Sequence, residues 1–236
     1  MALRDEYYIL KSDGIKIIKG EGKTILTRVL VNRIFEEVNG FSVHADILNL
    51  WKFKSFFIEI GGDIRHIEPG AFRDCEFINK LKIVINDNTS EFIIGNYAFF
   101  YCVNLENVEI SANKLFINKS AFSSCTKLKK VKLSCNEILI HQNVFMNCSS
   151  IENIIIPNKV IKLDAKAFWG CTAMKKIYIP KSYINCPNKF YATSAEIVLY
   201  DETDDIGMFI ARKPSFNGFN GVIRPNLIAN KKNNKS

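Results

Sequence analysis

Seven cysteines and three histidines are the residues of this sequence that could bind a metal ion or carry out redox chemistry. The cysteines form no C-x-x-C pair, and His44, His66 and His141 lie far apart, so the spacing typical of a zinc site is absent. The cysteine count is odd, and acids (Asp5, Glu6) stand where a secretory signal would be apolar, which argues against a disulfide framework. We therefore predict no metal, no cofactor and a structural role for most cysteines.

Five of the cysteines recur at a long and regular spacing. The step between them is 27 residues once and then 23 residues three times. These cysteines are Cys75, Cys102, Cys125, Cys148 and Cys171. Metal-binding and redox cysteines do not recur in this way, whereas structural repeats do. We expect a buried ladder of unbonded thiols, because stacked coils hold the Cβ vectors parallel. Cys135 and Cys186 lie off the ladder and are the better candidates for reactivity.

Each ladder cysteine ends the same local pattern, a small or apolar residue followed by Phe-x-x-Cys, as in Ala121-Phe122-Ser123-Ser124-Cys125. Aliphatic residues follow three, six and eight positions later, and this alternation with a period of two predicts a short strand. A second apolar run precedes each turn, as at 115–117. One unit cannot bury its own apolar face, but stacked units can, with Phe on Phe and Cys on Cys.

The pattern L-x-x-I-x-I-P followed by I-x-x-x-A-F-x-x-C resembles the BspA-type leucine-rich repeat over about residues 56–180. The resemblance implies a leucine-rich-repeat solenoid of the α/β-horseshoe class. It would form a single curved domain, dominated by strands and with short helical or 3-10 turns, whose strands line the concave side. Protein binding is the usual role in this family, which includes surface and adhesion proteins of bacteria and protozoa.

The repeats divide the chain into three predicted segments. Residues 1–41 form an N-terminal non-repeat segment, with strands at 7–10 and 15–18 and a short helix at about 27–38. Residues 42–200 form the solenoid, with a degenerate N-terminal cap coil at about 42–64 and a capping strand at 196–200. Residues 201–236 begin acidic, become rich in Asn and Lys, and are expected to be partly disordered.

Strand positions four, five and seven residues after each ladder cysteine supply the candidate binding surface, because those at five and seven point away from the core. Their charges alternate in sign from unit to unit, which suits Lys–Glu pairs between neighbouring strands. A nucleic-acid groove would carry one sign throughout. The other interpretation that stays open is a partner-binding surface with an apolar spot at Ile155 and Tyr178. The candidate partner-binding residues are Glu109, Lys130, Lys132, Ile155, Lys176 and Tyr178.

Signs of catalysis are absent from the sequence. His66 and His141 are expected in loops before the Phe turns, with no Ser/Asp or paired carboxylate at a diagnostic spacing. Gly61-Gly62-Asp63 is expected to be a turn rather than a phosphate-binding loop. We therefore predict that the chain is not an enzyme.

The leading functional hypothesis is a non-catalytic scaffold that binds a protein partner on the concave strand face, with a role in adhesion or host interaction implied by the resemblance. The alternative is an electrostatic binder of nucleic acid or an anionic membrane, suggested by a net charge of +8 and a pI of about 9.0. No apolar run is long enough for a transmembrane helix. Without a signal or anchor, the expected location is the cytoplasm, and the alternative is the cell surface by a non-classical route.

Overall fold

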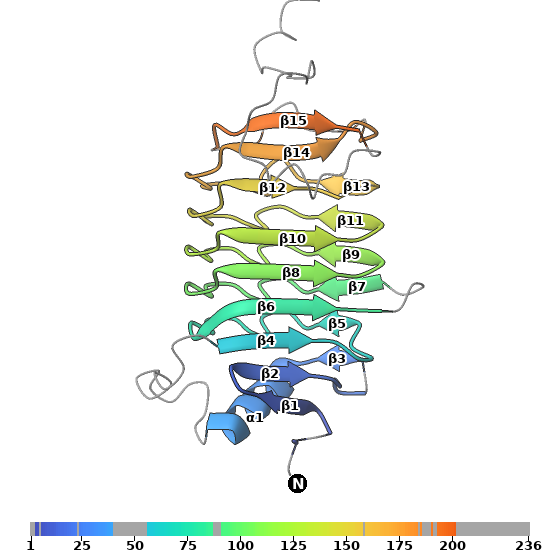
Figure 1. The fold of residues 1–236 in the computed structure, drawn as a ribbon, viewed down its shortest axis with the longest axis vertical. Helices are drawn as coiled ribbons and strands as arrows, with labels where there is room; N and C mark the ends of the chain where they lie inside the picture. The colour runs from blue at the N-terminus through green and yellow to red at the C-terminus, as the bar shows by residue number, and fades with distance from the viewer. Residues whose placement is uncertain are drawn as a thin grey trace, which may run out of the picture.

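The computed structural model describes residues 3–4, 6–22, 24–39, 56–86, 91–157, 159–183, 185, 190 and 193–201. Most of this chain winds into a β-solenoid, in which short strands stack coil upon coil along one axis (Figure 1). The predicted fold class, a strand-dominated repeat solenoid, is confirmed. Residues 42–55 of the expected cap coil, Cys186 and residues 202–236 of the expected tail lie outside the described residues.

Each coil from β2 to β13 contributes one strand to a front wall and one to a second wall, and β1, β14 and β15 lie in the front wall alone. Front strands pair in two sheets: β1 (Tyr8–Lys11), β2 (Gly14–Ile17), β4 (Phe56–Ile60), β6 (Ile78–Val84), β8 (Asn107–Ser111) and β10 (Lys130–Ser134), then β12 (Asn153–Ile155), β14 (Lys176–Pro180) and β15 (Glu196–Tyr200). Second-wall strands form one sheet: β3 (Ile25–Leu26), β5 (His66–Ile67), β7 (Glu91–Ile94), β9 (Lys114–Ile117), β11 (Glu137–Ile140) and β13 (Val160–Leu163). These pairs are parallel except β1 with β2, an antiparallel hairpin.

Alternation along the front strands separates a buried row from an outward row, as the period of two predicts. In β8, for example, Val108 and Ile110 are buried while Glu109 between them faces outward. The inward row is less well covered in β10, where Val131 and Leu133 are only partly buried, and at Leu199 of β15. Strand β10 lies where the first front sheet ends, since β12 belongs to the next sheet.

The Ala-Phe-x-x-Cys segments form a third wall of tight turns rather than helices. In the middle coil, Ser123 N–H donates to the Ser120 carbonyl at 3.1 Å, a 3-10-type bond. Ser120 and Ser124 have φ values of 56° and 63°, and these left-handed residues stop a helix from continuing. The turn backbones also bond from coil to coil, as Phe99 N–H does to the Ala121 carbonyl at 2.8 Å.

The phenylalanines of these turns form a continuous stack through the core. The rings of Phe99 and Phe122 are 5.0 Å apart with an interplanar angle of 2°, and those of Phe122 and Phe145 are 5.7 Å apart at 10°. Phe72 and Phe168 extend the stack at its two ends with the same near-parallel geometry. All five rings are fully buried, so the predicted Phe ladder is confirmed.

The ladder cysteines make an interaction that repeats with each coil. The Cys125 thiol donates to the carbonyl of Phe99 in the preceding coil, with Sγ 3.2 Å from the oxygen. Cys102, Cys148 and Cys171 do the same to the corresponding carbonyls, at 3.2, 3.1 and 3.0 Å. A small side chain with a weak donor therefore suits this position better than an aliphatic one.

Aromatic residues close both ends of the Phe stack. At the N-terminal end, Phe35 of α1 (Arg28–Asn39) packs edge-on against Phe72, with ring centroids 6.2 Å apart. Thr27 caps this helix, because its hydroxyl accepts from Leu30 N–H at 3.1 Å. At the other end, Phe190 packs edge-on against Phe168 at 5.2 Å. The predicted helix at 27–38, the hairpin before it and the strand at 196–200 are all present.

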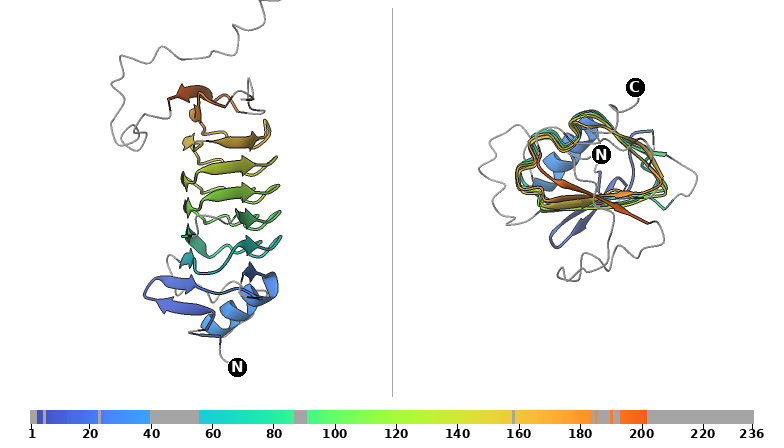
Figure 2. Two further views of the ribbon diagram at one scale, coloured as in Figure 1. Left: turned by 90° about the vertical axis from the view of Figure 1, so that its right-hand side faces the viewer. Right: turned by 90° about the horizontal axis from the view of Figure 1, so that it is seen from above.

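The coils superpose when the stack is viewed down its axis (Figure 2), so the front wall is nearly flat. A solenoid curves when the spacing between successive coils is larger on one wall than on the opposite wall. Here both walls consist of parallel strands, which share the same spacing of about 4.8 Å. The concavity expected for the strand face is therefore slight.

Replacing Phe122 with alanine should lower the free energy of unfolding by about 3–5 kcal/mol, because it leaves a cavity in the centre of the stack. The measurement is denaturation in urea. Phe116→Ala is a matched control, because Phe116 lies in β9 but is only partly buried. It should cost markedly less, and equal losses for the two variants would contradict the stacked-core account.

Candidate protein-binding face

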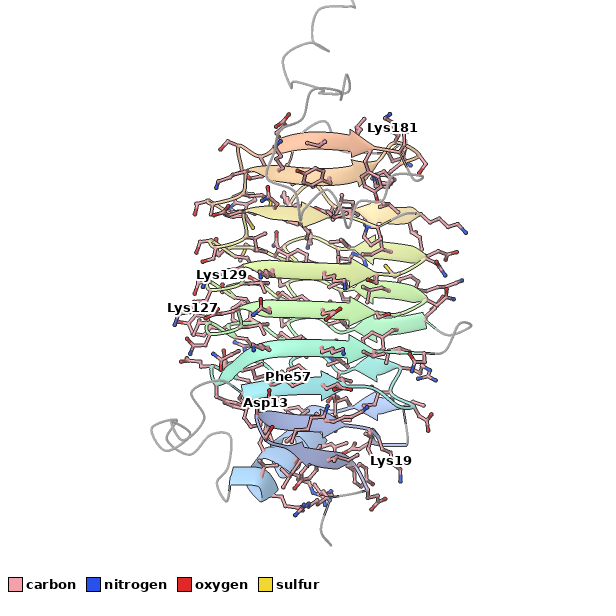
Figure 3. The ribbon with its side chains drawn as sticks, in the orientation of Figure 1. Asp13, Lys19, Phe57, Lys127, Lys129 and Lys181 are labelled. Atoms are coloured by element: carbon pink, nitrogen blue, oxygen red, sulfur yellow. The ribbon has the colours of Figure 1, made fainter. Side chains whose placement is uncertain are left out.

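The outward side chains of the front strands form one continuous surface, which we call the front face (Figure 3). Strand register sets its rows, because residues paired in a parallel ladder stand directly beside one another. One row contains Lys16, Glu59, Lys82, Glu109 and Lys132, which are paired in that order. Basic and acidic residues thus alternate strictly along this row.

Several of these neighbours form ion pairs. Lys132 Nζ lies 3.0 Å from Glu109 Oε1, and Lys16 Nζ lies 3.0 Å from Glu59 Oε1. A hydrogen bond from Lys11, together with Lys16, lowers the pKa of Glu59. The remaining pairs along the front strands and their approach segments are Lys129–Glu106 (3.3 Å), Lys175–Glu152 (2.8 Å) and Lys176–Glu196 (3.8 Å). The cross-strand pairing expected from the alternating signs is therefore present.

The same row becomes apolar in the last three front strands. Ile155 of β12 pairs with Tyr178 of β14, and Tyr178 pairs with Val198 of β15. All three are partly buried and face outward. Sequence reasoning identified Ile155 and Tyr178 but missed Val198, because the last step is 20 residues rather than 23. We call Ile155, Tyr178 and Val198 the apolar strip.

The structure places the six predicted partner-binding residues on one face but in different roles. Ile155 and Tyr178 stand side by side in the apolar strip. Lys132 and Glu109 are paired with each other, and Lys176 is paired with Glu196. Lys130 is exposed and stands beside Asn107 in the second outward row. Most of the charged candidates are therefore already engaged within the face.

A shallow groove of about 290 Å³ lies at the corner that follows the front strands. Its lining is mainly polar and includes Asn113 and Asn136, whose side chains are hydrogen-bonded at 2.7 Å. Cys135 also lines it and is partly exposed, whereas the five ladder thiols are buried. Burial nevertheless raises the pKa of Cys135 to about 12, so its thiol is un-ionised at neutral pH. The expectation that Cys135 is a reactive thiol is therefore not supported.

The two histidines within the described residues, His66 and His141, lie on different coils. His66 lies within β5 rather than in a loop, and His141 follows β11 as expected. Burial and the nearby Lys162 lower the pKa of His141. Among the residues that the structure describes, His, Cys, Asp and Glu form no cluster of three or more that could hold a metal ion.

The sequence matches the BspA type leucine rich repeat region over residues 65–198, in six copies. The chain belongs to this family. The match extends beyond the five copies expected from the cysteine ladder, because it includes residues up to 198 within β15. Proteins of the family are generally non-catalytic.

Solved structures of other leucine-rich repeat proteins resemble this chain. The T. pallidum leucine rich repeat protein is 18% identical, with 93% of this chain and 99% of that one covered and a TM-score of 0.47. A leucine-rich repeat protein from Bacteroides ovatus is 20% identical, with coverages of 64% and 55% and a TM-score of 0.38. A leucine rich cell surface protein from Faecalibacterium prausnitzii is 17% identical, with coverages of 85% and 76% and a TM-score of 0.29. Curated proteins yielded no match.

In the described part of the chain, no helix has the length and apolarity that a bilayer span requires.

The buried thiols should make the protein sensitive to alkaline pH. Burial raises the pKa of Cys171 to about 12 and that of Cys125 well above its usual value, whereas an unfolded thiol ionises at about 8.5. The unfolded state therefore releases protons that the folded state keeps, and stability falls as pH rises from about 8.5 toward 12. Each such thiol should contribute about 1.4 kcal/mol per pH unit within this window.

The measurement is the free energy of unfolding as a function of pH, for the wild type and for Cys125→Ala. The variant should be less stable at neutral pH but should show a shallower alkaline decline. Equal slopes would contradict the burial of this thiol. At neutral pH, a thiol reagent should modify the ladder cysteines only after unfolding.

Proposed function

We propose that this protein is a non-catalytic scaffold that binds a protein partner through the front face, with the apolar strip at the centre of the contact. The observation that supports it is the change of character within one row. The row is charged and alternating from Lys16 to Lys132, then apolar from Ile155 to Val198. Stacking alone does not require this change, since the other front strands stack with alternating Lys and Glu residues in this row.

The surroundings of the apolar strip match the usual anatomy of a protein interface. Protein contacts commonly have an apolar centre, often with a tyrosine, inside a polar rim. Here Lys132 lies one coil before the strip, and the Lys176–Glu196 pair lies in the adjacent row. Such rim charges influence orientation and association rate more than affinity. The nearly flat face also suits a folded partner better than a small ligand.

The alternative, electrostatic binding of nucleic acid or an anionic membrane, has less support. Such binding uses lysines and arginines that neutralise phosphates, ideally on a surface of one sign. On the front face, Lys16, Lys132 and Lys176 are instead next to glutamates. The lysines of these rows are therefore interspersed with glutamates and do not form a surface of one sign.

The described cysteines favour one of the two locations considered for the protein. The six described cysteines are free thiols, and unbonded thiols are typical of a reducing compartment. We therefore favour a cytoplasmic partner. Relatives in the family are often surface-associated, so an adhesive role at the cell surface is the alternative. Protease treatment of intact cells separates the two, because only a surface-exposed chain would be cut.

The double variant Ile155→Asp/Tyr178→Ala should abolish partner binding and leave the melting temperature nearly unchanged, because both side chains point away from the core. The partner captured by the wild-type chain would be purified and titrated against each variant by calorimetry. Ile161→Asp is the matched control, since Ile161 is 48% exposed on β13 in the second wall. It should bind like the wild type.

Three results would contradict the proposal. Unfolding of the double variant would make the strip structural, and undiminished binding would place the contact elsewhere. Binding that weakens by orders of magnitude between 50 and 200 mM salt, roughly the behaviour of a protein with many phosphate contacts, would favour the electrostatic alternative.

A further inference from the structure

Two tyrosines on the wall of turns adopt a backbone conformation that bulky residues seldom take. Tyr97 has a φ of 57° and Tyr101 a φ of 60°, both in the left-handed region. This region brings Cβ close to the backbone carbonyl, so it is costly for residues other than Gly, Asn and Asp. A large aromatic residue at such a position is an outlier that requires an explanation.

Other coils show what the turn itself requires at these two positions. Where the equivalent residues of other coils also have a positive φ, their side chains are small or belong to residue types that tolerate a positive φ. Five residues before the ladder cysteine these are Gly70, Ser120 and Asn143, and one residue before it they are Asp74, Ser124, Asn147 and Gly170. The turn therefore forms without an aromatic residue, and the fold does not demand Tyr97 or Tyr101.

The core does not account for the tyrosines either. Their side chains are 36% and 45% exposed, whereas Phe99 between them is fully buried. Tyr97 packs edge-on against Phe100 at a centroid distance of 5.7 Å, and Phe100 lies 6.1 Å from Tyr101. The guanidinium of Arg73, from the preceding coil, lies over the Phe100 ring at 5.1 Å. We call Arg73, Tyr97, Phe100 and Tyr101 the turn patch.

We propose that the turn patch is a second docking site, distinct from the front face, for an acidic segment of a partner protein. Tyr, Phe and Arg are the residues that most often anchor protein interfaces, because rigid rings offer a large contact area at little entropic cost. The two tyrosines are strained and exposed. Packing does not explain their presence in the turns, whereas binding to a partner would.

Charge around the turn patch determines the chemistry of the partner. Arg73 lies on one side, and exposed Lys119 lies on the other, since its carbonyl accepts from Tyr97 N–H at 3.0 Å. The acid in the turn of Arg73 is Asp74, whose carboxylate is 3.3 Å from the Arg73 guanidinium. A segment with carboxylates beside an apolar side chain therefore complements the patch. A second copy of this chain does not, because its net charge of +8 is repulsive.

Nucleic acid is the less suitable occupant of this wall. Bases stack on aromatic rings, but a bound strand also needs a line of cations along its backbone. Within the turn patch and the next turn, Arg73 and Lys119 are two separate cations on opposite sides of the rings and do not form such a line. The groove described above lies at the corner after the front strands, not on this wall.

The probe for this site is a random peptide library displayed on phage and selected against the intact chain. The selected peptides should be rich in Asp and Glu next to apolar residues. Fluorescence anisotropy of one such peptide should show at least tenfold weaker binding to Tyr97→Asn/Tyr101→Asn. The urea midpoint of this variant should be equal to or higher than that of the wild type, because asparagine tolerates the left-handed conformation.

Two further variants make the test specific. Ser124→Asn places the same side chain at the position of Tyr101 in the next coil and should bind the peptide normally. Ile155→Asp/Tyr178→Ala should also bind it normally, which separates this site from the front face.

The inference is overturned by any of four results: no acidic peptides selected, equal binding by the tyrosine variant, a lower urea midpoint for it, or peptide binding lost in the front-face variant. It is also overturned if oligo(dT) binds more tightly than the peptide and loses affinity in the tyrosine variant, which would assign the patch to nucleic acid.

Discussion

Stacking of each coil on the next in strict register is the constraint on which the rest of this structure depends. All three walls, the front strands, the second strands and the turns, are bonded from coil to coil through the backbone, except that β10 and β12 belong to separate front sheets. Because equivalent residues must then stand directly above one another, each side chain meets its own counterpart. Inside, this produces the Phe stack and the regular contact that four of the five ladder thiols, from Cys102 to Cys171, make with a carbonyl of the preceding coil.

The same register constrains the outer surface. Identical charges at one outward position would stand about 4.8 Å apart and repel, so the signs must alternate or the position must be uncharged. The row from Lys16 to Lys132 follows the first solution. The apolar strip follows the second, at the cost of exposing apolar surface to water. Departures from the simplest stacking solution are the places where we propose that binding, rather than folding, explains the residue.

In the turns, the constraint on residue type comes from the left-handed backbone conformation, and here too some residues depart from the preferred types. Left-handed residues lie at the start and at the end of the turn, and most coils use Gly, Ser, Asn or Asp at these positions. Tyr97 and Tyr101 satisfy the turn while adding exposed aromatic surface. In a repeat protein, the equivalent positions of other coils show which residue types the fold needs. A residue that departs from those types and is not buried can therefore be recognised by comparison with the other coils.

The sequence by itself determined the coil: the ladder residues, the two strand runs, the inward Phe and Cys, and the candidate pair of Ile155 and Tyr178. This was possible because stacking repeats one local pattern, so periodicity in sequence is periodicity in space. Tertiary structure alone decided what depends on neighbours from other coils. It added Val198 to the strip across a 20-residue step, gave each ladder thiol a carbonyl partner, and left Val131 partly exposed at the end of the first front sheet. It also made the strand face nearly flat. Curvature depends on the difference in coil-to-coil spacing between opposite walls, which is a property of the assembled coils and not of any single residue.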